Sequence, residues 1–309
     1  MKEKIVIVGN GAAGNAALEE ILSQNATCEL TVITSEGLPI YYRPMLSEYI
    51  SETQIPKRFY LHEQSWYDSN NVSVMYEKSV LSINPSEQTL TLSDNQIVPY
   101  DKLILTTGSK NFIPPIPGSK RANVYDLRTF ADAEQIKAKA SDAKKAVIIG
   151  GGLLGLELGW QLRKLNIDVT VIEMMQRLLP RQLDEEASEI FEEKVSATGI
   201  KVLKGVQTME IVGNELATGV LISTGETIEA DMVMFSIGIR ADVFLAKEAG
   251  LLIERGIVVN DFMETSIKNI FAAGDCAEFS GINYAIWPEA VEQGKIAGLN
   301  AIGIKTVYQ

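Results

Sequence analysis

Two glycine-rich segments with the same pattern constrain the fold of this 309-residue chain most strongly. Residues 6–22 read VIVGNGAAGNAALEEIL, and residues 146–162 read AVIIGGGLLGLELGWQL. Each segment begins with an apolar run, contains G-x-G-x-x-G, and continues with the pattern of a helix. A strand, a glycine turn and a helix in this order form the unit that binds the pyrophosphate of a dinucleotide. The sequence predicts two such units, whose first glycines lie 141 positions apart (150 − 9).

The first copy places each glycine where a dinucleotide needs it. Residues 5–8 form a short apolar run typical of a buried parallel strand. Gly9 allows the tight turn, Gly11 lets the backbone approach a pyrophosphate, and Gly14 lets the helix pack close to the strand. The helix expected at residues 12–23 directs its N-terminal N–H groups at that pyrophosphate, and ELTVIT then returns as a second strand.

The second copy repeats this arrangement with Gly150, Gly152 and Gly155, preceded by the strand 146–149 and followed by the return strand DVTVIE. A single G-x-G-x-x-G can be a glycine-rich turn that binds nothing. Here each copy has its strand, its helix and its second strand within ~30 residues, which is the confirming context. The two halves of one dinucleotide fold do not each carry the pattern. The sequence therefore predicts that the chain binds two dinucleotides.

The residue at the end of each return strand distinguishes the two sites. Glu173 ends the second return strand, 23 residues after Gly150 (173 − 150). A carboxylate there accepts hydrogen bonds from the ribose 2′-OH of NADH and repels the 2′-phosphate of NADPH. Arg177 offers the opposite preference, since an arginine can bind that phosphate. In the first copy the matching residue is Thr34, and the acidic candidate, Glu36, comes two residues later.

Scarce residue types exclude several kinds of site. Cys28 and Cys276 are the only cysteines and stand in no paired motif, so neither a structural zinc site nor an active-site disulfide is expected. His62 is the only histidine, and we interpret it as an ordinary surface residue. A Ser-His-Asp or Cys-His site would have to use it. The organic chemistry is therefore expected to come from a bound cofactor, with no metal.

Charge and hydropathy narrow the partners and the location. A net charge of −12 argues against a nucleic-acid partner, whose phosphates need basic residues. No apolar run approaches the ~20 residues that span a bilayer, so no membrane partner is expected. The N-terminus lacks the pattern of a signal peptide, and we expect a cytoplasmic protein. The sequence leaves the oligomeric state open.

Three further stretches, with the two glycine turns, resemble the FAD/NAD(P)-dependent pyridine nucleotide-disulfide oxidoreductase superfamily. YDKLILTTGS (100–109) is similar to the strand and turn that close the FAD domain of that family. MFSIGIRAD (234–242) resembles the return crossing, although Ala241-Asp242 replaces the usual Pro-Asn. TSIKNIFAAGDCAEF (265–279) is similar to the second FAD signature, in which Asp275 would accept a hydrogen bond from the ribityl chain.

The resemblance implies an α/β fold with two Rossmann-like dinucleotide-binding domains, as in the glutathione-reductase type. The FAD-binding domain would comprise residues 1–112 and 241–309, and the NADH-binding domain, 113–240, would be inserted between them. The proline-rich IPPIPG (113–118) is interpreted as the linker, because prolines fix φ and remove backbone donors. Family members continue with an interface domain of roughly 70–80 residues, a small-domain size, which is expected to be absent here.

Each domain is also expected to carry an antiparallel β-meander. In the first domain KSVLSIN, QTLTLS and QIVPYD supply its strands. In the second, GVLISTGETIEAD and the strand upstream of it form the counterpart.

The segment after Glu36 indicates the branch of the superfamily. Disulfide reductases carry one or two redox cysteines there, whereas this chain has LPIYYRPMLSEYI. YYRPMLSEY resembles the branch of NADH:rubredoxin oxidoreductase and the nitrite-reductase flavodomain, while related ferredoxin reductases usually carry a lysine where Glu48 stands. Arg43 and Pro44 would then lie at the flavin. The alternative is an ordinary helix start with proline in its first turn.

The resemblance supplies the remaining site residues. Glu157 would face the nicotinamide and the flavin edge, and the alternative is a solvated helix residue. Trp287 would contact the flavin pyrimidine ring, and the alternative is a buried core tryptophan. No catalytic residue is expected beyond the flavin, with Glu157 and Arg43 as candidates near the ring. The FAD set is Gly9, Gly11, Ala13, Gly14, Glu36, Arg43, Pro44, Val80, Thr107, Gly108, Asp275 and Trp287. The NADH set is Gly150, Gly152, Leu154, Gly155, Glu157, Glu173 and Gly238.

These observations predict an NADH-dependent FAD oxidoreductase. FAD would be held non-covalently, since neither cysteine nor the histidine lies in an attachment motif. Electrons would pass from NADH through FAD to a one-electron acceptor, a small redox protein such as rubredoxin or a related iron centre. The alternatives are a flavodomain serving nitrite reduction, reduction of dioxygen, and a flavin-dependent redox sensor or protein-binding module of the apoptosis-inducing-factor type.

Overall fold

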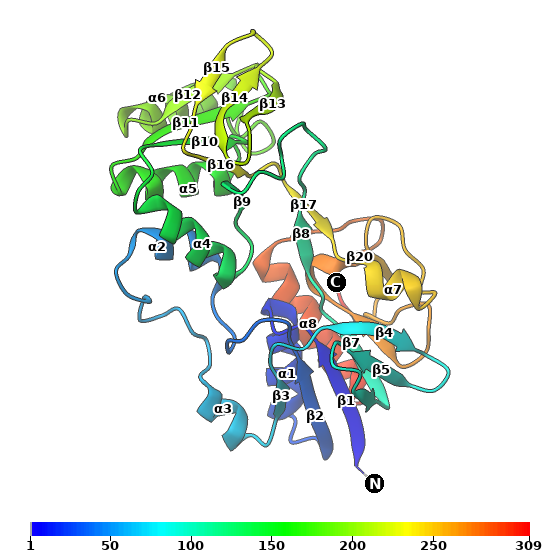
Figure 1. Ribbon diagram of the computed structural model, residues 1–309. Helices are drawn as coiled ribbons and strands as arrows, with labels where there is room; N and C mark the ends of the chain where they lie inside the picture. Colours follow the sequence, from blue (N-terminus) through cyan, green and yellow to red (C-terminus); the bar gives the residue numbers. More distant parts are fainter. Residues whose placement is uncertain (1) are drawn as a thin grey trace. The chain divides into compact units, whose positions relative to one another are not determined.

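The computed structural model describes residues 2–309, which form two compact units (Figure 1). Unit 1 contains the chain up to Tyr42 together with Arg58–Lys110 and Arg240–Gln309. Unit 2 contains Arg43–Lys57 and Asn111–Ile239.

The division expected from the sequence (1–112, 113–240 and 241–309) differs from these units mainly at residues 43–57. This segment forms the short turn η1 (Arg43–Met45) and helix α2 (Leu46–Ser51). Helix α2 packs against α4 (Phe130–Ala140) and α5 (Leu153–Lys164) of unit 2. The assignment of the domains to FAD and to NADH stays a prediction.

A five-stranded parallel sheet forms the centre of unit 1, in the order β19-β7-β1-β2-β3 (Figure 1). Its strands are β1 (Glu3–Val8), β2 (Cys28–Ile33), β3 (Ser73–Met75), β7 (Lys102–Leu105) and β19 (Ile270–Ala272). Helix α1 (Ala12–Ser23) follows β1, as the sequence predicts, and α8 (Trp287–Ala301) packs against α1.

Unit 2 has a sheet of the same kind, in the order β12-β11-β10-β16-β9. Its strands are β9 (Val124–Asp126), β10 (Lys145–Ile149), β11 (Asp168–Glu173), β12 (Lys201–Lys204) and β16 (Met232–Phe235). Strands β10, β11, β12 and β16 take the places of β1, β2, β3 and β7. Helix α5 stands where α1 stands, and α6 (Glu185–Ala197) precedes β12. Each unit is a Rossmann-like parallel sheet with a glycine turn after its central strand, which confirms the predicted fold class.

The two β-meanders expected from the sequence are confirmed. In unit 1, β4 (Val80–Asn84), β5 (Thr89–Leu92) and β6 (Ile97–Pro99) form an antiparallel sheet. In unit 2, β13 (Thr208–Gly213), β14 (Ala217–Ile222) and β15 (Thr227–Glu229) do the same. Each meander lies in the sequence between the edge strand β3 or β12 and the inner strand β7 or β16.

The remaining elements complete unit 1 and the two chain crossings. Strands β8 (Ser109–Asn111) and β17 (Ile239–Ala241) pair with each other and contain the points at which the chain passes between the units. The others are α3 (Gln64–Ser69), α7 (Phe244–Glu248), β18 (Ile257–Val259), the turn η2 (Gly274–Cys276) and β20 (Ala277–Phe279).

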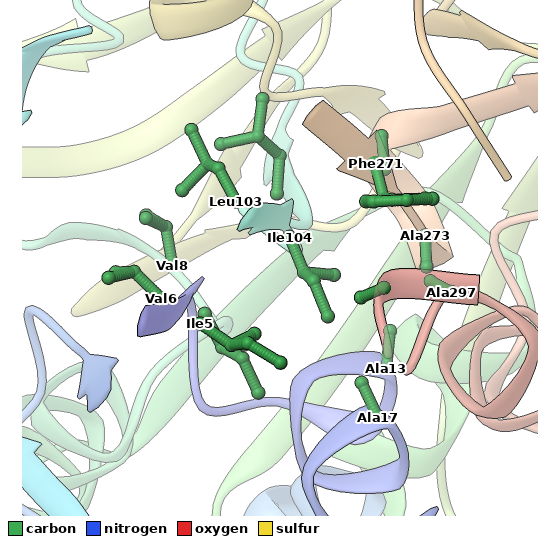
Figure 2. Close-up of a cluster of buried hydrophobic side chains, with 14 of the residues drawn as sticks. Ile5, Val6, Val8, Ala13, Ala17, Leu103, Ile104, Phe271, Ala273 and Ala297 are labelled. Carbon is green, nitrogen blue, oxygen red and sulfur yellow. The ribbon is translucent and has the colours of Figure 1, made fainter. Parts of the chain in front are cut away.

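The core of unit 1 lies between its parallel sheet and helices α1 and α8 (Figure 2). Alternate faces of β1 are both buried, which explains the uninterrupted apolar run of residues 5–8. Small side chains let the two helices approach closely. A Cβ atom added at Gly294 of α8 would lie 2.2 Å from the Ala13 carbonyl oxygen of α1, and one at Gly298 would lie 2.6 Å from that of Ala17.

Candidate dinucleotide-binding sites

The first glycine turn is shaped by contacts that leave no room for side chains at two of its glycines. Gly9 has φ of +109°, and a Cβ there would lie 2.2 Å from the Thr106 carbonyl oxygen. A Cβ at Gly14 would lie 2.1 Å from the Gly9 carbonyl oxygen. At Gly11, by contrast, a Cβ would meet nothing within 4 Å. The middle glycine therefore leaves its backbone open, as the approach of a pyrophosphate requires.

The second turn has the same geometry. Gly150 has φ of +116°, and a Cβ there would lie 2.2 Å from the Ser236 carbonyl oxygen. A Cβ at Gly155 would lie 2.3 Å from the Gly150 carbonyl oxygen, whereas Gly152 again faces open space. The first glycine of each turn makes the same backbone hydrogen bond. Gly9 N donates to Ile33 O, and Gly150 N donates to Ile172 O, both at 2.8 Å.

The helices that follow the turns begin without a side-chain cap. Gly11 is the N-cap of α1 and Gly152 that of α5, and no side chain accepts from the first N–H groups of either helix. Two other helices of unit 2 do have side-chain caps: Thr129 caps α4 and Asp184 caps α6. Uncapped N–H groups at a helix N-terminus form an anion site, because the helix dipole adds positive potential there. Both turns therefore fit the pyrophosphate of a dinucleotide.

One buried acceptor in α1, the helix that follows the first turn, is left unpaired. Asn15 follows Gly14 in α1 and is only 5% exposed. Its Oδ1 has no hydrogen-bond partner among residues 2–309. A buried polar atom left unpaired costs free energy, so a donor from outside the described chain would stabilise it.

Glu173 ends β11, and the chain fixes its carboxylate from two sides. Oε2 accepts from the Gly151 N–H at 2.8 Å, and Oε1 accepts from the Met175 N–H at 2.8 Å. Gly151 leaves room for this contact, because a Cβ there would lie 3.0 Å from Glu173 Oε2 and 2.7 Å from Leu178 Cδ2, and these side chains would have to shift. The carboxylate is thereby held at the second glycine turn, where the sequence predicts the adenine ribose of NADH.

Arg177 is occupied by other partners within unit 2. Its guanidinium pairs with Glu185 at 3.5 Å and donates to the Pro180 carbonyl oxygen at 3.3 Å. The Glu185 carboxylate of this ion pair is 86% exposed, so the contact is weak, and the preference for a 2′-phosphate raised for Arg177 stays a prediction.

In unit 1 the residue that matches Glu173 at the end of the return strand is Thr34. Glu36 lies beyond the end of β2, and its Oε2 accepts from the Tyr41 hydroxyl at 2.6 Å. Asn10, which occupies the place of Gly151, instead has its side-chain amide next to the hydroxyl of Tyr67. The predicted ribose role of Glu36 stays a prediction.

Asp275 meets the turn after β7 in unit 1. Its Oδ2 accepts from the Ser109 hydroxyl at 2.7 Å, and its own carbonyl oxygen accepts from Asn283 Nδ2 at 2.8 Å. The neighbouring Thr107 hydroxyl donates to the Asp242 carbonyl oxygen at 2.7 Å, and Asp242 N donates to Gly108 O at 2.9 Å. The structure thus brings together Thr107, Gly108 and Asp275, which the sequence placed in one site.

Trp287 begins α8, as expected from the proline that follows it. The indole is partly exposed, so it is not the buried core tryptophan of the alternative interpretation. Its ring lies edge-on to Tyr42, with ring centroids 4.9 Å apart. Ala13 and Val80 of the predicted FAD set are both buried.

The remaining predicted residues lie in unit 2. Arg43 and Pro44 form η1, and the Arg43 guanidinium donates to the Arg128 carbonyl oxygen. Leu154 is exposed in the first turn of α5, and Gly238 has φ of +105° before β17. Glu157 is half-buried one turn further along α5, and its carboxylate has no hydrogen bond or ion pair within residues 2–309.

Cys276 and His62 lie in surroundings that do not suggest a catalytic role. Cys276 is fully buried, and burial raises the pKa of its thiol, so it is a poor nucleophile. The side chain of His62 contacts Glu19 at 2.5 Å and stacks on Trp66, with ring centroids 3.7 Å apart. No group of three or more potential metal-ligating side chains comes together in residues 2–309. Within that range no helix combines the length and the apolar character that a bilayer crossing needs.

Three contributing residues escaped the sequence analysis. The Thr106 hydroxyl donates to the carbonyl oxygens of Val8 and Gly9, both at 3.0 Å, and so closes the base of the first turn. Ser109 holds Asp275, and Gly151 makes room for Glu173. The first two stand in TTGS (106–109), a stretch that the sequence analysis used for its glycine and one threonine.

The chain is similar in sequence and in fold to known oxidoreductases. The chain is 39% identical over 306 residues to a nitrite reductase [NAD(P)H] of Bacillus subtilis, covering 99% of this chain and 38% of that protein. It is 33% identical to the NADH-rubredoxin oxidoreductase of Clostridium acetobutylicum, covering 99% of this chain and 76% of that protein. The crystal structure of a ferredoxin reductase from Rhodopseudomonas palustris superimposes with a TM-score of 0.94 at 27% identity, over 99% of this chain and 78% of that one.

The chain therefore spans less than two fifths of the nitrite reductase that it matches, but about three quarters of the rubredoxin oxidoreductase. A model of the pyridine nucleotide-disulphide oxidoreductases matches residues 3–294, in agreement with the two glycine turns and the two parallel sheets. The chain belongs to the pyridine nucleotide-disulphide oxidoreductase family.

Proposed function

We propose that this chain is an NADH-dependent FAD oxidoreductase that delivers single electrons to a small iron protein. The observation that carries the proposal is the pair of glycine turns, each with an open middle glycine and an uncapped helix behind it. Two anion sites of this kind call for two dinucleotides. Bound FAD supplies the chemistry that turns a two-electron hydride donor into a source of single electrons.

The chain's own residues hold and orient the two cofactors. In unit 1, Gly9, Gly11 and Gly14 with the N-terminus of α1 would bind the FAD pyrophosphate, and Asp275 would accept from a ribityl hydroxyl. The N-terminal amides of α8, which no side chain caps, would stabilise negative charge on the ring. Trp287 and Val80 would belong to the same set.

In unit 2, Gly150, Gly152 and Gly155 would bind the pyrophosphate of NADH, and Glu173 would accept from its adenine ribose. Since backbone N–H groups already fix both carboxylate oxygens, the carboxylate is positioned before the coenzyme arrives. Glu157, with no partner of its own, would face the nicotinamide. None of these residues needs to give or take a proton for hydride transfer.

Rubredoxin is the acceptor that we favour, because a relative named for that reaction matches 99% of this chain and 76% of its own length. A second candidate is the flavodomain of a nitrite-reducing system. Its support is the 39% identity to the Bacillus nitrite reductase and the 34% identity to an assimilatory nitrate reductase electron transfer subunit of the same organism. A cytoplasmic location belongs to the same proposal and can be tested by cell fractionation.

An anaerobic titration of the purified yellow protein with NADH, followed by rubredoxin, tests the proposal. We expect one equivalent of NADH to bleach the flavin absorbance and rubredoxin to restore it with rapid turnover. Restoration by a sirohaem-containing nitrite reductase module but not by rubredoxin would favour the second candidate. Bleaching without turnover by any one-electron acceptor would contradict the enzyme and favour a redox sensor or protein-binding module.

A further inference from the structure

A fully buried tyrosine contacts the side chain within the first glycine turn. Tyr67 of α3 is 0% exposed, and its hydroxyl oxygen lies 3.1 Å from Nδ2 and 3.3 Å from Oδ1 of Asn10. The Ile40 N–H also donates to this hydroxyl, at 3.4 Å. A tyrosine hydroxyl is protonated at neutral pH, and burial raises the pKa of Tyr67 further.

Tyr67 is itself held rigidly in unit 1. Its ring packs edge-on against Trp66 and His62, with ring centroids 5.2 Å and 6.4 Å away. Its carbonyl oxygen accepts from the Val72 N–H at 3.0 Å, at the point where α3 ends. The hydroxyl is therefore a fixed point to which the turn is attached.

The turn needs such a point, because Asn10 stands between two glycines. Glycine has the greatest backbone freedom of all residues, so a segment flanked by Gly9 and Gly11 loses entropy when a ligand orders it. In unit 2 the same place in the turn is held through the backbone, where the Gly151 N–H donates to Glu173. In unit 1 the residue that matches Glu173 is Thr34, and the Asn10 side chain contacts the Tyr67 hydroxyl.

We propose that Tyr67 is a positioning residue for the first glycine turn, which it holds through the Asn10 amide in the shape that receives the FAD pyrophosphate. The inference rests on the proposed function, since it takes FAD to be the ligand of this turn. Ordering the turn in advance lowers the entropy lost on binding, so the contact acts on FAD affinity without touching FAD.

The test measures FAD release from the purified holoprotein on dilution, through the fluorescence of free flavin. Tyr67→Phe removes only the hydroxyl, and Asn10→Ala removes only the amide. Each is expected to raise the Kd for FAD about 3- to 10-fold, the effect of losing one neutral hydrogen bond. The double variant is expected to match either single variant, because all three lack the same contact. The Kd for NAD⁺ by calorimetry should stay within about twofold of wild type, since the second turn is intact.

Tyr76→Phe is the matched control. Tyr76 is a half-buried tyrosine of unit 1, and burial raises its pKa to about 12. Its hydroxyl donates to Gln64 at 2.7 Å and does not contact the turn. This variant should release FAD as wild type does, whereas equal losses in Tyr67→Phe and Tyr76→Phe would reveal a general packing effect and overturn the inference.

Three results separate the inference from the proposed function. Wild-type protein that holds no FAD would overturn the proposed function itself. Wild type that holds FAD, with unchanged Kd in Asn10→Ala, would overturn the inference alone, and this variant serves even if Tyr67→Phe does not fold. Losses that add in the double variant would show two independent effects and would also overturn it.

Discussion

In unit 1 the residue between the first two glycines is Asn10, and in unit 2 it is Gly151. The backbones around them are alike, with first glycines at φ of +109° and +116° and the same clash of an added Cβ at 2.2 Å. What differs is the group that contacts the residue between the first two glycines. Glu173 accepts from the Gly151 N–H in unit 2, whereas Tyr67 contacts the Asn10 side chain in unit 1.

The two turns share the features that suit a pyrophosphate and differ in the features expected to distinguish one dinucleotide from the other. The features common to both turns, the tight first glycine and the uncapped helix, suit any pyrophosphate. Under the proposed function, the features that differ would act where the turn meets the rest of each dinucleotide. The Glu173 carboxylate at the second turn would select a ribose with a free 2′-OH, and Asp275 would hold FAD in unit 1.

The largest effect is expected from replacing the tight first glycine of the turn in one unit only. In Gly150→Ala, backbone strain of about 1–3 kcal/mol and a clash of similar size both oppose the native turn. We expect NAD⁺ affinity to fall on the order of several hundredfold while FAD stays bound. Calorimetry with NAD⁺ and the flavin absorbance measure the two.

Gly9→Ala is the counterpart, with the Thr106 carbonyl oxygen in the same place. It should lose FAD and keep unit 2 folded, as thermal denaturation would report. Loss of both cofactors in both variants would contradict the separate roles of the two turns.

A smaller effect is expected from removing the carboxylate that distinguishes unit 2. Glu173→Ala removes an acceptor whose charge-assisted hydrogen bonds contribute about 1.5–3 kcal/mol. The preference for NADH over NADPH in kcat/KM should then narrow by about ten- to a hundredfold, mainly through KM for NADH, with FAD content unchanged.

Glu36→Ala is a control in the first unit, since Glu36 accepts from the Tyr41 hydroxyl in unit 1. It should leave the coenzyme preference as it is. If wild type uses both coenzymes equally, or if Glu173→Ala keeps its full preference, the role assigned to Glu173 is wrong.

Placing asparagine, the residue that unit 1 has at position 10, at Gly151 of unit 2 sharpens the comparison further. In Gly151→Asn, the new Cβ would lie 3.0 Å from Glu173 Oε2 and 2.7 Å from Leu178 Cδ2, so the carboxylate must shift. NADH affinity should fall about tenfold, within the range for overpacking. A Gly151→Asn variant with wild-type KM for NADH would show that the position of the carboxylate does not matter.

The smallest effect is expected at the contact between Ser109 and Asp275 in unit 1. Ser109→Ala removes the hydroxyl that donates to Asp275 but leaves the carboxylate in place. FAD should dissociate about threefold more readily, less than in Asp275→Ala, which removes the acceptor itself. Equilibrium dialysis of the holoproteins measures both, and equal FAD retention in Asp275→Ala and wild type would count against this site.

Local patterns in the sequence were sufficient for the elements that carry the turns. The helix expected at 12–23 is α1, and DVTVIE is strand β11, because apolar periodicity and glycine position are visible within a few residues. The meanders follow for the same reason. The placement of residues 43–57 in unit 2 was not predictable, because Tyr49 contacts Glu134, 85 positions away, and no local signal marks such a pair.

The same reason explains the site residues that the sequence did not indicate. Tyr67 lies 57 positions from Asn10, Thr106 lies 97 from Gly9, and Ser109 lies 166 from Asp275. Each is a polar side chain of ordinary type whose role depends on a partner that the fold brings close. The glycines could be assigned because their role depends on the backbone, which a motif records directly.

The central claim is that each unit binds its own dinucleotide, and counting both cofactors on one sample tests it most directly. Acid precipitation of the purified protein releases FAD for quantification, and calorimetry of the intact holoprotein with NAD⁺ gives the second stoichiometry. We predict one FAD per chain, released intact into the supernatant, and one NAD⁺ per chain bound without displacing it. Displacement of FAD by NAD⁺, or yellow colour that stays with the precipitate, would contradict the account.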